Sequence, residues 1–207
     1  MTSERIAELL APFLGGTMLS PIQIGQVSTF LDLLLKWNAK TNLTAVRDPE
    51  QIITRHFGES LFAAKYVLST GSAETAIDVG SGAGFPGLPL KIWGQQLQLT
   101  LVESNHKKAI FLKEVVRALQ LRGVTVLTER AERLKVKAQL VSLRAVERFE
   151  AVLPVTRGLL APGGRLVALI GPTQIETANR LVTDISWQPP IAVPNSEARV
   201  LLVGTHR

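Results

Sequence analysis

The sequence predicts an α/β fold in which a doubly wound, mostly parallel sheet follows a helical N-terminal region. Three observations support this prediction. Residues 1–70 carry apolar positions at helical spacing, whereas from residue 75 short apolar segments alternate with amphipathic ones. At the C-terminus, two apolar segments, 185–194 and 197–207, follow each other with no helical pattern between them. These last segments predict a hairpin that adds an antiparallel edge strand to the sheet.

The N-terminal region is expected to contain three helices. Ser20 followed by Pro21 is a typical helix start, because serine caps free N–H groups and proline fits the first helical position. Asp48 followed by Pro49 starts the third helix in the same way. A polar stretch then separates two parts of the chain, a helical region of residues 1–72 and a core of residues 73–207 packed against it.

The core is expected to alternate strands with helices. Apolar, β-branched runs predict strands within 75–80, 97–103, 124–129, 140–146 and 161–171. Amphipathic patterns predict helices within 85–94, 105–121 and 147–160. This alternation is typical of a Rossmann-like sheet, and the C-terminal hairpin is typical of the class I S-adenosylmethionine-dependent methyltransferases rather than of nicotinamide-binding proteins.

Composition excludes several kinds of site. The chain has 207 residues and no cysteine, which excludes disulfides, thiolate metal sites and cysteine nucleophiles. Its three histidines are scattered, so no metal site is expected. No apolar run reaches the roughly 18 residues of a membrane span, and the N-terminus does not resemble a signal peptide. We expect a cytoplasmic protein without membrane association.

Positive charge is concentrated in one part of the chain. Residues 105–148 contain 11 Lys and Arg against 4 Glu, whereas the whole chain has a net charge of +6. Such a band is typical of a surface that binds a polyanion, although a solvated helical face would show the same pattern. The residues expected to steer an RNA backbone are Lys107, Lys108, Arg130, Arg133, Lys135 and Arg148.

A glycine-rich segment follows the first predicted strand. It fits the dinucleotide pattern at Gly82, Gly84 and Gly87, and also the pattern D-x-G-x-G-x-G from Asp78 to Gly84. An acid at the end of the strand would repel a pyrophosphate, whereas a sulfonium and an ammonium tolerate it. We therefore expect Asp78, Gly80, Gly82 and Gly84 to bind S-adenosylmethionine, with a nicotinamide cofactor or a purely structural turn as the alternatives.

Acidic residues end the next two predicted strands. Glu103 is placed to accept hydrogen bonds from the two ribose hydroxyls of an adenosine, which suits either cofactor. Ala131 and Glu132 follow the third strand, where such folds hold the adenine.

The chain lacks the residues that several kinds of methyl acceptor require. Pyrimidine C5 chemistry needs a cysteine, which is absent. The loop after the fourth strand reads SLRAVE and lacks the Asn/Asp-Pro-Pro-aromatic pattern that is typical of enzymes that methylate exocyclic amines. Enzymes that methylate the ribose 2′-hydroxyl commonly have an acid at the fourth strand, where this chain has Gln139 and Leu140. Guanine N7 remains, because its in-plane lone pair needs placement rather than a base.

The sequence resembles the bacterial small-subunit (16S) ribosomal RNA guanine-N7 methyltransferases, first named glucose-inhibited division protein B. The resemblance covers nearly the whole chain and includes LLLKWNAKTNLTAVRDPE, RHFGESL, DVGSGAGFPGLPLKI and LVESNHKKAIFLKEV. It implies an enzyme that methylates 16S rRNA, alone or in the small ribosomal subunit. Cofactor contacts are implied at Gly80, Gly82, Phe85, Glu103, Ala131, Glu132 and Arg144. The Asn-Leu-Thr and Arg-His segments fall on Asn42, Leu43, Thr44, Arg55 and His56, with RNA binding or structural hydrogen bonding as their two interpretations.

Three positions depart from the family pattern. Glu59 stands for an aspartate, Gln139 for an acid, and Ile170 for a lysine that could contact RNA. We expect Arg144 and Arg130 near the target base, no dedicated general base, and a monomer. A non-catalytic RNA-binding protein on the same fold and an NAD-dependent oxidoreductase are the remaining alternatives.

Overall fold

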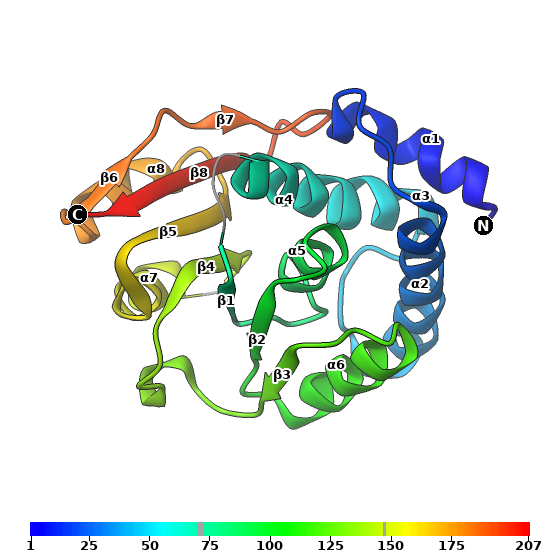
Figure 1. The fold of residues 1–207 in the computed structure, drawn as a ribbon, viewed down its shortest axis with the longest axis horizontal. Helices are drawn as coiled ribbons and strands as arrows, with labels where there is room; N and C mark the ends of the chain where they lie inside the picture. The colour runs from blue at the N-terminus through cyan, green and yellow to red at the C-terminus, as the bar shows by residue number, and fades with distance from the viewer. Residues whose placement is uncertain (70–72, 147) are drawn as a thin grey trace.

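The computed structural model describes residues 1–69, 73–146 and 148–207 and is built around an eight-stranded mixed sheet (Figure 1). The strand order is β3-β2-β1-β4-β5-β8-β6, and β7 also pairs with β8. The first five strands are parallel: β1 (Thr75–Val79), β2 (Gln98–Val102), β3 (Val124–Leu127), β4 (Ala138–Arg144) and β5 (Leu160–Ile170). This order confirms the doubly wound sheet, in which the chain reverses its direction of winding between β1 and β4.

The C-terminal strands add an antiparallel edge, as the sequence predicts. Strand β8 (Val200–His206) runs antiparallel to β5, and β6 (Ile185–Trp187) and β7 (Ile191–Ala192) pair with its other side. The antiparallel strand β8 is therefore not outermost, and the expected strand 185–194 is split into two. The split falls at Pro189 and Pro190, which lack the N–H groups that strand pairing needs.

The N-terminal region forms α1 (Ser3–Leu14), α2 (Pro21–Thr41), α3 (Pro49–Ile52), the π-helical turns η1 (Ile53–Gly58) and α4 (Glu59–Ser69). Ser20 caps α2 in a reciprocal capping box with Gln23, which confirms the predicted start. The third predicted helix is interrupted by η1, which carries Arg55 and His56. Wide π-type turns occur frequently at functional sites.

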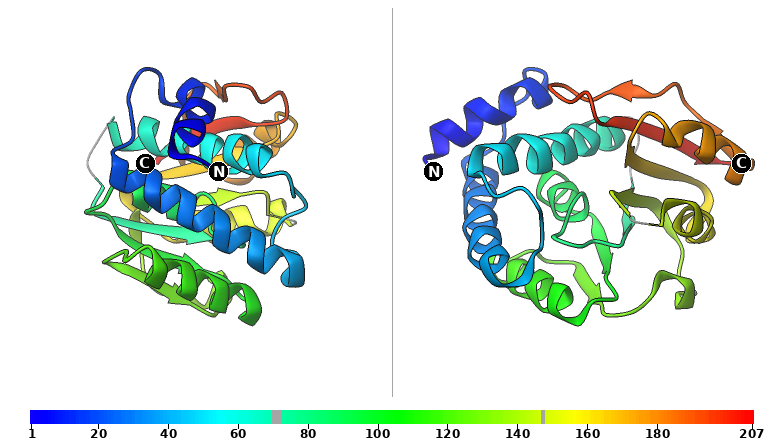
Figure 2. Two further views of the ribbon diagram at one scale, coloured as in Figure 1. Left: turned by 90° about the vertical axis from the view of Figure 1, so that its right-hand side faces the viewer. Right: turned by 180° about the vertical axis from the view of Figure 1, so that it is seen from behind.

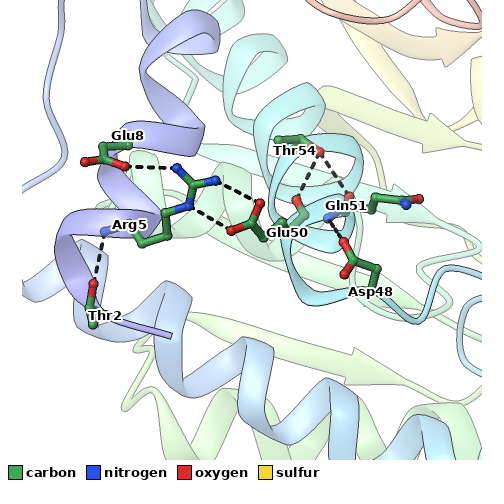
Figure 3. A network of polar contacts seen from close by, with 7 residues as sticks. All are labelled: Thr2, Arg5, Glu8, Asp48, Glu50, Gln51 and Thr54. Atoms are coloured by element: carbon green, nitrogen blue, oxygen red, sulfur yellow. Dashed lines mark hydrogen bonds and ion pairs between the residues drawn. The ribbon is translucent and has the colours of Figure 1, made fainter.

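Polar contacts at the ends of α1 and α3 hold these two helices together (Figure 3). Arg5 donates two hydrogen bonds to the Glu50 carboxylate, from Nε at 2.8 Å and from Nη2 at 2.9 Å. Thr2 and Asp48 cap the two helices by accepting from backbone N–H groups. Because the Arg5–Glu50 pair is exposed, it fixes the orientation of the helices more than it stabilises them.

The remaining helices are α5 (Gly87–Trp93), α6 (His106–Ala118), the 3₁₀ turn η2 (Ala131–Arg133), α7 (Phe149–Gly158) and α8 (Gln174–Leu181). Helix α8 falls in a stretch, 174–181, for which the sequence predicted no helix or strand. This helix was missed because it is short and polar, with Ala178 as its buried residue.

Alternating side chains along the strands divide the helices between two faces of the sheet. Ala76 and Leu140 belong to an apolar cluster with the N-terminal helices, α5 and α6, whereas Ile77 and Val141 pack with α7 and α8. The N-terminal helices and one face of the sheet thus share a single core (Figure 2). The proposed boundary between 72 and 73 adjoins residues 70–72, which lie outside the described residues.

Candidate functional site

A cavity of about 660 Å³ opens at the carboxyl ends of β1, β2, β3 and β4. In doubly wound folds ligands bind at this end of the sheet, next to the point where the strand order reverses. The volume is within the range of small-molecule sites. Its wall contains Gly80, Gly82, Phe85, Glu103, Lys108, Arg130, Ala131, Glu132, Arg144 and Arg148 from the residues selected by sequence.

The glycines of the loop after β1 serve two purposes. Gly82 lines the cavity with a φ of 55°, and a Cβ there would meet only the Gly80 carbonyl oxygen, at 3.7 Å. Gly87 lies away from the cavity, and a Cβ on it would come within 2.6 Å of Leu101 and 2.7 Å of the Asp78 carboxylate. The first half of the loop therefore leaves the cavity wall bare, and the second half lets α5 pack closely on the sheet. Gly84, which we expected in the cavity, belongs to this second half and does not line it.

Glu103 connects the end of β2 to the glycine loop. Its Oε2 accepts a hydrogen bond from Gly82 N at 2.9 Å, and its Oε1 accepts from Asn105 N at 2.7 Å. A bound pyrophosphate would need backbone N–H groups of this loop, yet the Gly82 N–H is used by a carboxylate that would itself repel a phosphate. The geometry favours a cofactor without phosphate. Each carboxylate oxygen retains a lone pair for a ligand hydroxyl.

Asp78 does not line the cavity, and this corrects the expectation that it faces the cofactor. The side chain is fully buried, and its Oδ1 accepts a hydrogen bond from Ser142 Oγ at 2.7 Å. Alternation along β1 turns Asp78 toward α5, on the side opposite Ile77 and Val79. Burial raises the pKa of Asp78 to about 6, against the opposing effect of the Ser142 hydrogen bond. Of these two acids, Glu103 is therefore the one that lines the cavity.

The buried Asp78 predicts a specific pH dependence of stability. Because its pKa rises from 3.8 to about 6 in the folded protein, the neutral acid is the favoured form and its ionisation weakens the fold. The Asp78 contribution is complete below pH 4 and is lost as the pH rises through about 6. We expect Asp78→Asn to gain stability relative to the wild type by roughly 2–2.5 kcal/mol between pH 4 and pH 7.5. Urea unfolding of both proteins at the two pH values measures this difference, and an unchanged gap would contradict it.

The two arginines expected near the target base lie at different parts of the cavity. Arg130 adjoins Ala131 and Glu132 after β3, whereas Arg144 ends β4. Two strands, β2 and β1, separate β3 from β4, so the distance across the sheet is roughly 14 Å. Arg130 is thus placed at the end where an adenine is expected, and Arg144 is placed near the other end.

Arg144 is held in a buried polar network with the N-terminal helices. Its Nη2 donates to Glu59 Oε2 at 2.8 Å and to the Arg55 carbonyl at 2.7 Å, and it lies 3.2 Å from His56 Nδ1. The Arg144 and Glu59 side chains are only 9% and 4% exposed. Glu59 Oε1 also accepts from Ser196 Oγ at 3.1 Å, which brings in the loop before β8. The aspartate-to-glutamate departure is therefore accommodated by an ion pair that joins three parts of the chain.

His56 completes the network on the cavity side. Its Nε2 lies 2.7 Å from Thr44 Oγ1, and Thr44 lines the cavity in the segment between α2 and α3. Burial, reinforced by the positive charge of Arg144, lowers the pKa of His56 to about 3, so the ring is neutral. His56 thus lines the cavity from within this network, whereas Arg55 is exposed and outside the cavity wall.

Phe85 lies between the glycine loop and the N-terminal helices. It stacks on Phe30 of α2 with ring centroids 5.1 Å apart, and it meets Phe57 of η1 edge-on at 5.0 Å. Its ring is nearly buried while still contributing to the cavity wall. This packing couples the position of the loop to the N-terminal helices.

Sequence reasoning missed part of the cavity wall. Leu43 and Thr44 were noted only as part of a motif, and Ala145 and the α7 residues Val152 and Val155 were not selected. Ala145 has a φ of 50°, a conformation that costs a non-glycine residue about 1 kcal/mol or more and is often retained at functional sites. The apolar pattern of α7 gave no signal, because the same pattern also predicts simple packing.

The other basic residues divide between the cavity and the surface. Lys108, Arg130 and Arg148 line the cavity, whereas Lys107, Arg133 and Lys135 are exposed outside its wall. All six follow β2 in the chain, and the three in the cavity wall, Lys108, Arg130 and Arg148, come after β2, β3 and β4 respectively.

The other two residues that differ from the family pattern, Gln139 and Ile170, lie away from the cavity. Gln139 is at the start of β4, where its Oε1 accepts from the backbone N–H groups of Glu74 and Thr75 at 2.7 and 3.3 Å. Ile170 is 1% exposed and packs on the face of the sheet covered by α7 and α8. Neither side chain lines the cavity, so neither substitution alters its wall.

The described part of the chain contains neither a membrane-spanning helix nor a group of possible metal ligands. Residues 1–69, 73–146 and 148–207 contain no helix with both the length and the apolar character needed to cross a membrane. Within the same ranges, no three His, Cys, Asp or Glu side chains are grouped so that they could hold a metal ion.

Comparison with known proteins identifies the family. A family profile described as rRNA small subunit methyltransferase G matches residues 23–193. The ribosomal RNA small subunit methyltransferase G of Roseiflexus sp. (strain RS-1) is 42% identical over 205 residues, covering 91% of this chain and 85% of that protein. The protein of the same name from Xanthomonas campestris pv. campestris (strain B100) is 40% identical over 184 residues, covering 86% of this chain and 84% of that protein.

Solved structures show the same fold at low sequence identity. Magnesium protoporphyrin IX methyltransferase from Synechocystis PCC 6803, with bound S-adenosylmethionine, superposes with a TM-score of 0.68 at 13% identity, covering 86% of this chain and 97% of that one. A S-adenosylmethionine-dependent methyltransferase from Aquifex aeolicus has a TM-score of 0.59 at 16% identity, covering 80% and 96%. The expected class I methyltransferase fold and the family resemblance are both confirmed, and the chain belongs to the rRNA small subunit methyltransferase G family.

Proposed function

We propose that this protein transfers a methyl group from S-adenosylmethionine to N7 of a guanosine in 16S ribosomal RNA. Family membership supports the methyltransferase activity and the ribosomal RNA substrate. One structural observation supports N7 as the acceptor: the cavity wall near the end of β4 offers no free base among the described residues. An acceptor that carries no proton needs none.

The candidate bases at this end of the cavity are all engaged. Glu59 is paired with Arg144 and accepts from Ser196. His56 Nδ1 lies against the Arg144 guanidinium, so it cannot take up a proton without breaking that contact. Asp78 is buried beneath the glycine loop. These contacts support catalysis by placement, in which N7 is held in line with the methyl group.

The residues of the cavity suit S-adenosylmethionine. Glu103 would accept the ribose hydroxyls, and Ala131 and Glu132 would border the adenine, as the family resemblance implies. The Gly82 wall, where a Cβ would project into free space, would allow the cofactor to approach the backbone. When bound, S-adenosylmethionine would supply a methyl group on its sulfonium, and the N7–C bond would form from the N7 lone pair as the C–S bond breaks.

Methyl transfer to purified small subunits tests this proposal. Subunits from a strain without the enzyme are incubated with the protein and radiolabelled S-adenosylmethionine, and nucleosides are separated after digestion. The proposal expects label in 7-methylguanosine. Calorimetry addresses the two alternatives, because an oxidoreductase would bind NAD in preference and a non-catalytic RNA-binding protein would transfer no methyl group.

The basic residues around the cavity opening support electrostatic binding of RNA. We expect affinity for small subunits or 16S rRNA to fall steeply between about 50 and 200 mM salt, because each contact to phosphate releases counterions. Lys107→Gln and Lys135→Gln should each reduce the slope of log affinity against log salt by about 1. Arg207→Gln is the matched control and should leave the slope unchanged, because Arg207 follows the antiparallel strand β8 and so lies at the edge of the sheet opposite the cavity. A flat salt dependence of the wild type would contradict this role of the basic residues.

We further propose that the protein acts as a monomer in the cytoplasm, where ribosomal particles are assembled. Size-exclusion chromatography with light scattering at micromolar concentration tests the oligomeric state.

A further inference from the structure

Helix α6 carries more positive charge than the other helices of the described chain. Four of its side chains are cationic and one is acidic: Lys107, Lys108, Lys113 and Arg117 against Glu114. Helices α4, α7 and α8 instead carry one acid and one base each. Within the described ranges, none of the four cations of α6 forms an ion pair. A helix face that is only solvated commonly mixes both signs, so the single sign on α6 favours an anionic partner.

Three exposed residues of α6 form one stripe along its outer face. Ile110, Lys113 and Arg117 follow each other at spacings of three and four residues, which places them on the same side of the helix. The other side of the helix, which includes Phe111, is buried in the core shared with the N-terminal helices. Ile110 is 43% exposed, so the stripe combines cations with an apolar side chain that is open to solvent.

The single acid of α6 is engaged by a neighbouring helix. Glu114 Oε2 accepts a hydrogen bond from Trp37 Nε1 of α2 at 3.1 Å, and the two helices lie side by side (Figure 2). The Glu114 side chain is half-buried in this contact. Its carboxylate is therefore committed to the packing of α2 on α6 and is not paired with the cations of the stripe.

The cations of α6 begin at the edge of the cavity. Helix α6 starts shortly after the end of β2, and Lys108 in its first turn lines the cavity, whereas Lys107 is exposed beside it. From Lys107 to Arg117 the helix axis advances by about 15 Å, at 1.5 Å per residue. A polyanion that places one of its units in the cavity can therefore continue along α6 and meet further cations.

We propose that the outer face of α6, made of Lys107, Ile110, Lys113 and Arg117, docks the ribose–phosphate backbone of the 16S rRNA segment next to the target guanosine. This inference rests on the proposed function, because it assigns a docking surface for the same substrate outside the cavity. A row of unpaired cations is complementary to a chain of phosphates, and the exposed Ile110 can pack against a ribose. Contacts of this kind position the RNA without reading its sequence.

The double variant Lys113→Gln with Arg117→Gln tests this surface. Arg180→Gln with Arg207→Gln is the matched control, because it removes the same charge elsewhere: α8, which carries Arg180, packs on the face of the sheet opposite to α6. Affinity for small subunits from a strain without the enzyme is measured at several salt concentrations. Single-turnover methyl transfer is measured at saturating subunits, and calorimetry with S-adenosylmethionine and thermal unfolding check the cofactor site and the fold.

We expect the α6 double variant to bind small subunits about 10- to 30-fold more weakly at about 150 mM salt, because each lost phosphate contact costs about four- to fivefold there. The slope of log affinity against log salt should fall by about 1.5–2. The single-turnover rate and the affinity for S-adenosylmethionine should stay within about threefold of the wild type, because neither side chain lines the cavity. The control should bind subunits within about twofold of the wild type.

The absence of cysteine from the chain allows the surface to be located directly. Ile110→Cys and Arg180→Cys each introduce a single thiol, to which an iron–EDTA group is attached so that hydroxyl radicals cut nearby RNA. We expect cleavage of 16S rRNA close to the methylated guanosine from position 110 and no cleavage there from position 180. This readout does not depend on methyl transfer.

Several results would overturn the proposal. Equal weakening of the α6 variant and the control would show a response to net charge rather than a docking surface. Unchanged affinity of the α6 variant, or a lower single-turnover rate at unchanged affinity, would remove the docking role. Cleavage from position 110 that is absent or confined to RNA far from the guanosine would do the same. Failure of the wild type to form 7-methylguanosine would contradict the proposed function instead, since binding and cleavage are measured without it.

Discussion

Glu59→Gln is expected to lower the free energy of unfolding by about 3–5 kcal/mol, because it leaves the Arg144 guanidinium buried without a counter-charge. Burial lowers the pKa of Arg144, whereas the Glu59 carboxylate opposes this shift. Glutamine keeps the size of the side chain and one hydrogen-bond acceptor, so the loss of stability measures the effect of removing the negative charge of Glu59. Urea unfolding followed by circular dichroism measures it.

Two further variants separate charge from packing. The double variant Glu59→Gln with Arg144→Met removes both charges and should recover a large part of the loss, since a buried pair is less costly to replace than to break. Ser196→Ala removes only the weaker partner of Glu59 and is the matched control, with an expected cost of about 1 kcal/mol. A cost below about 1 kcal/mol for Glu59→Gln would show that Arg144 is not dependent on its partner.

Glu103→Ala is expected to weaken S-adenosylmethionine binding by about 100-fold or more. In the proposed binding mode the variant would lose two charge-assisted hydrogen bonds to the ribose, each contributing about 1.5–3 kcal/mol, and it also frees the Gly82 N–H that holds the loop. Isothermal titration calorimetry of the purified variant measures the change.

An analogue of the cofactor identifies the cause of this loss. S-adenosylmethionine without its ribose hydroxyls should bind the wild type weakly and bind Glu103→Ala with a similar affinity. Glu129→Ala is the matched control, because Glu129 lines the same cavity without a hydrogen bond to the glycine loop. An affinity of Glu103→Ala within about threefold of the wild type would contradict the assigned role.

Local signals in the sequence predicted the elements that frame the site. Ser20, Pro21 and Asp48 determine helix starts through short-range hydrogen bonds, so they can be recognised without tertiary information. The bare glycine loop and the acid at the end of β2 were predicted for the same reason, since both follow directly from strand ends. The family motifs added the nature of the substrate.

Contacts between distant residues could not be predicted in this way. Glu59 and Arg144 are separated by 85 positions, and their ion pair depends on how η1 and α4 pack over the end of β4. The orientation of Asp78 depends on the phase of alternation in β1, and a shift of one residue would have turned it to the opposite face of the sheet.

The central claim is that this chain methylates N7 of one guanosine in 16S ribosomal RNA. The most direct measurement is mass spectrometry of 16S rRNA fragments from a strain with the protein, a strain without it, and that strain complemented with wild type or Glu103→Ala. We expect one 7-methylguanosine to disappear without the protein, to return with the wild type and not to return with Glu103→Ala. An unchanged set of 7-methylguanosines across all four samples would contradict it.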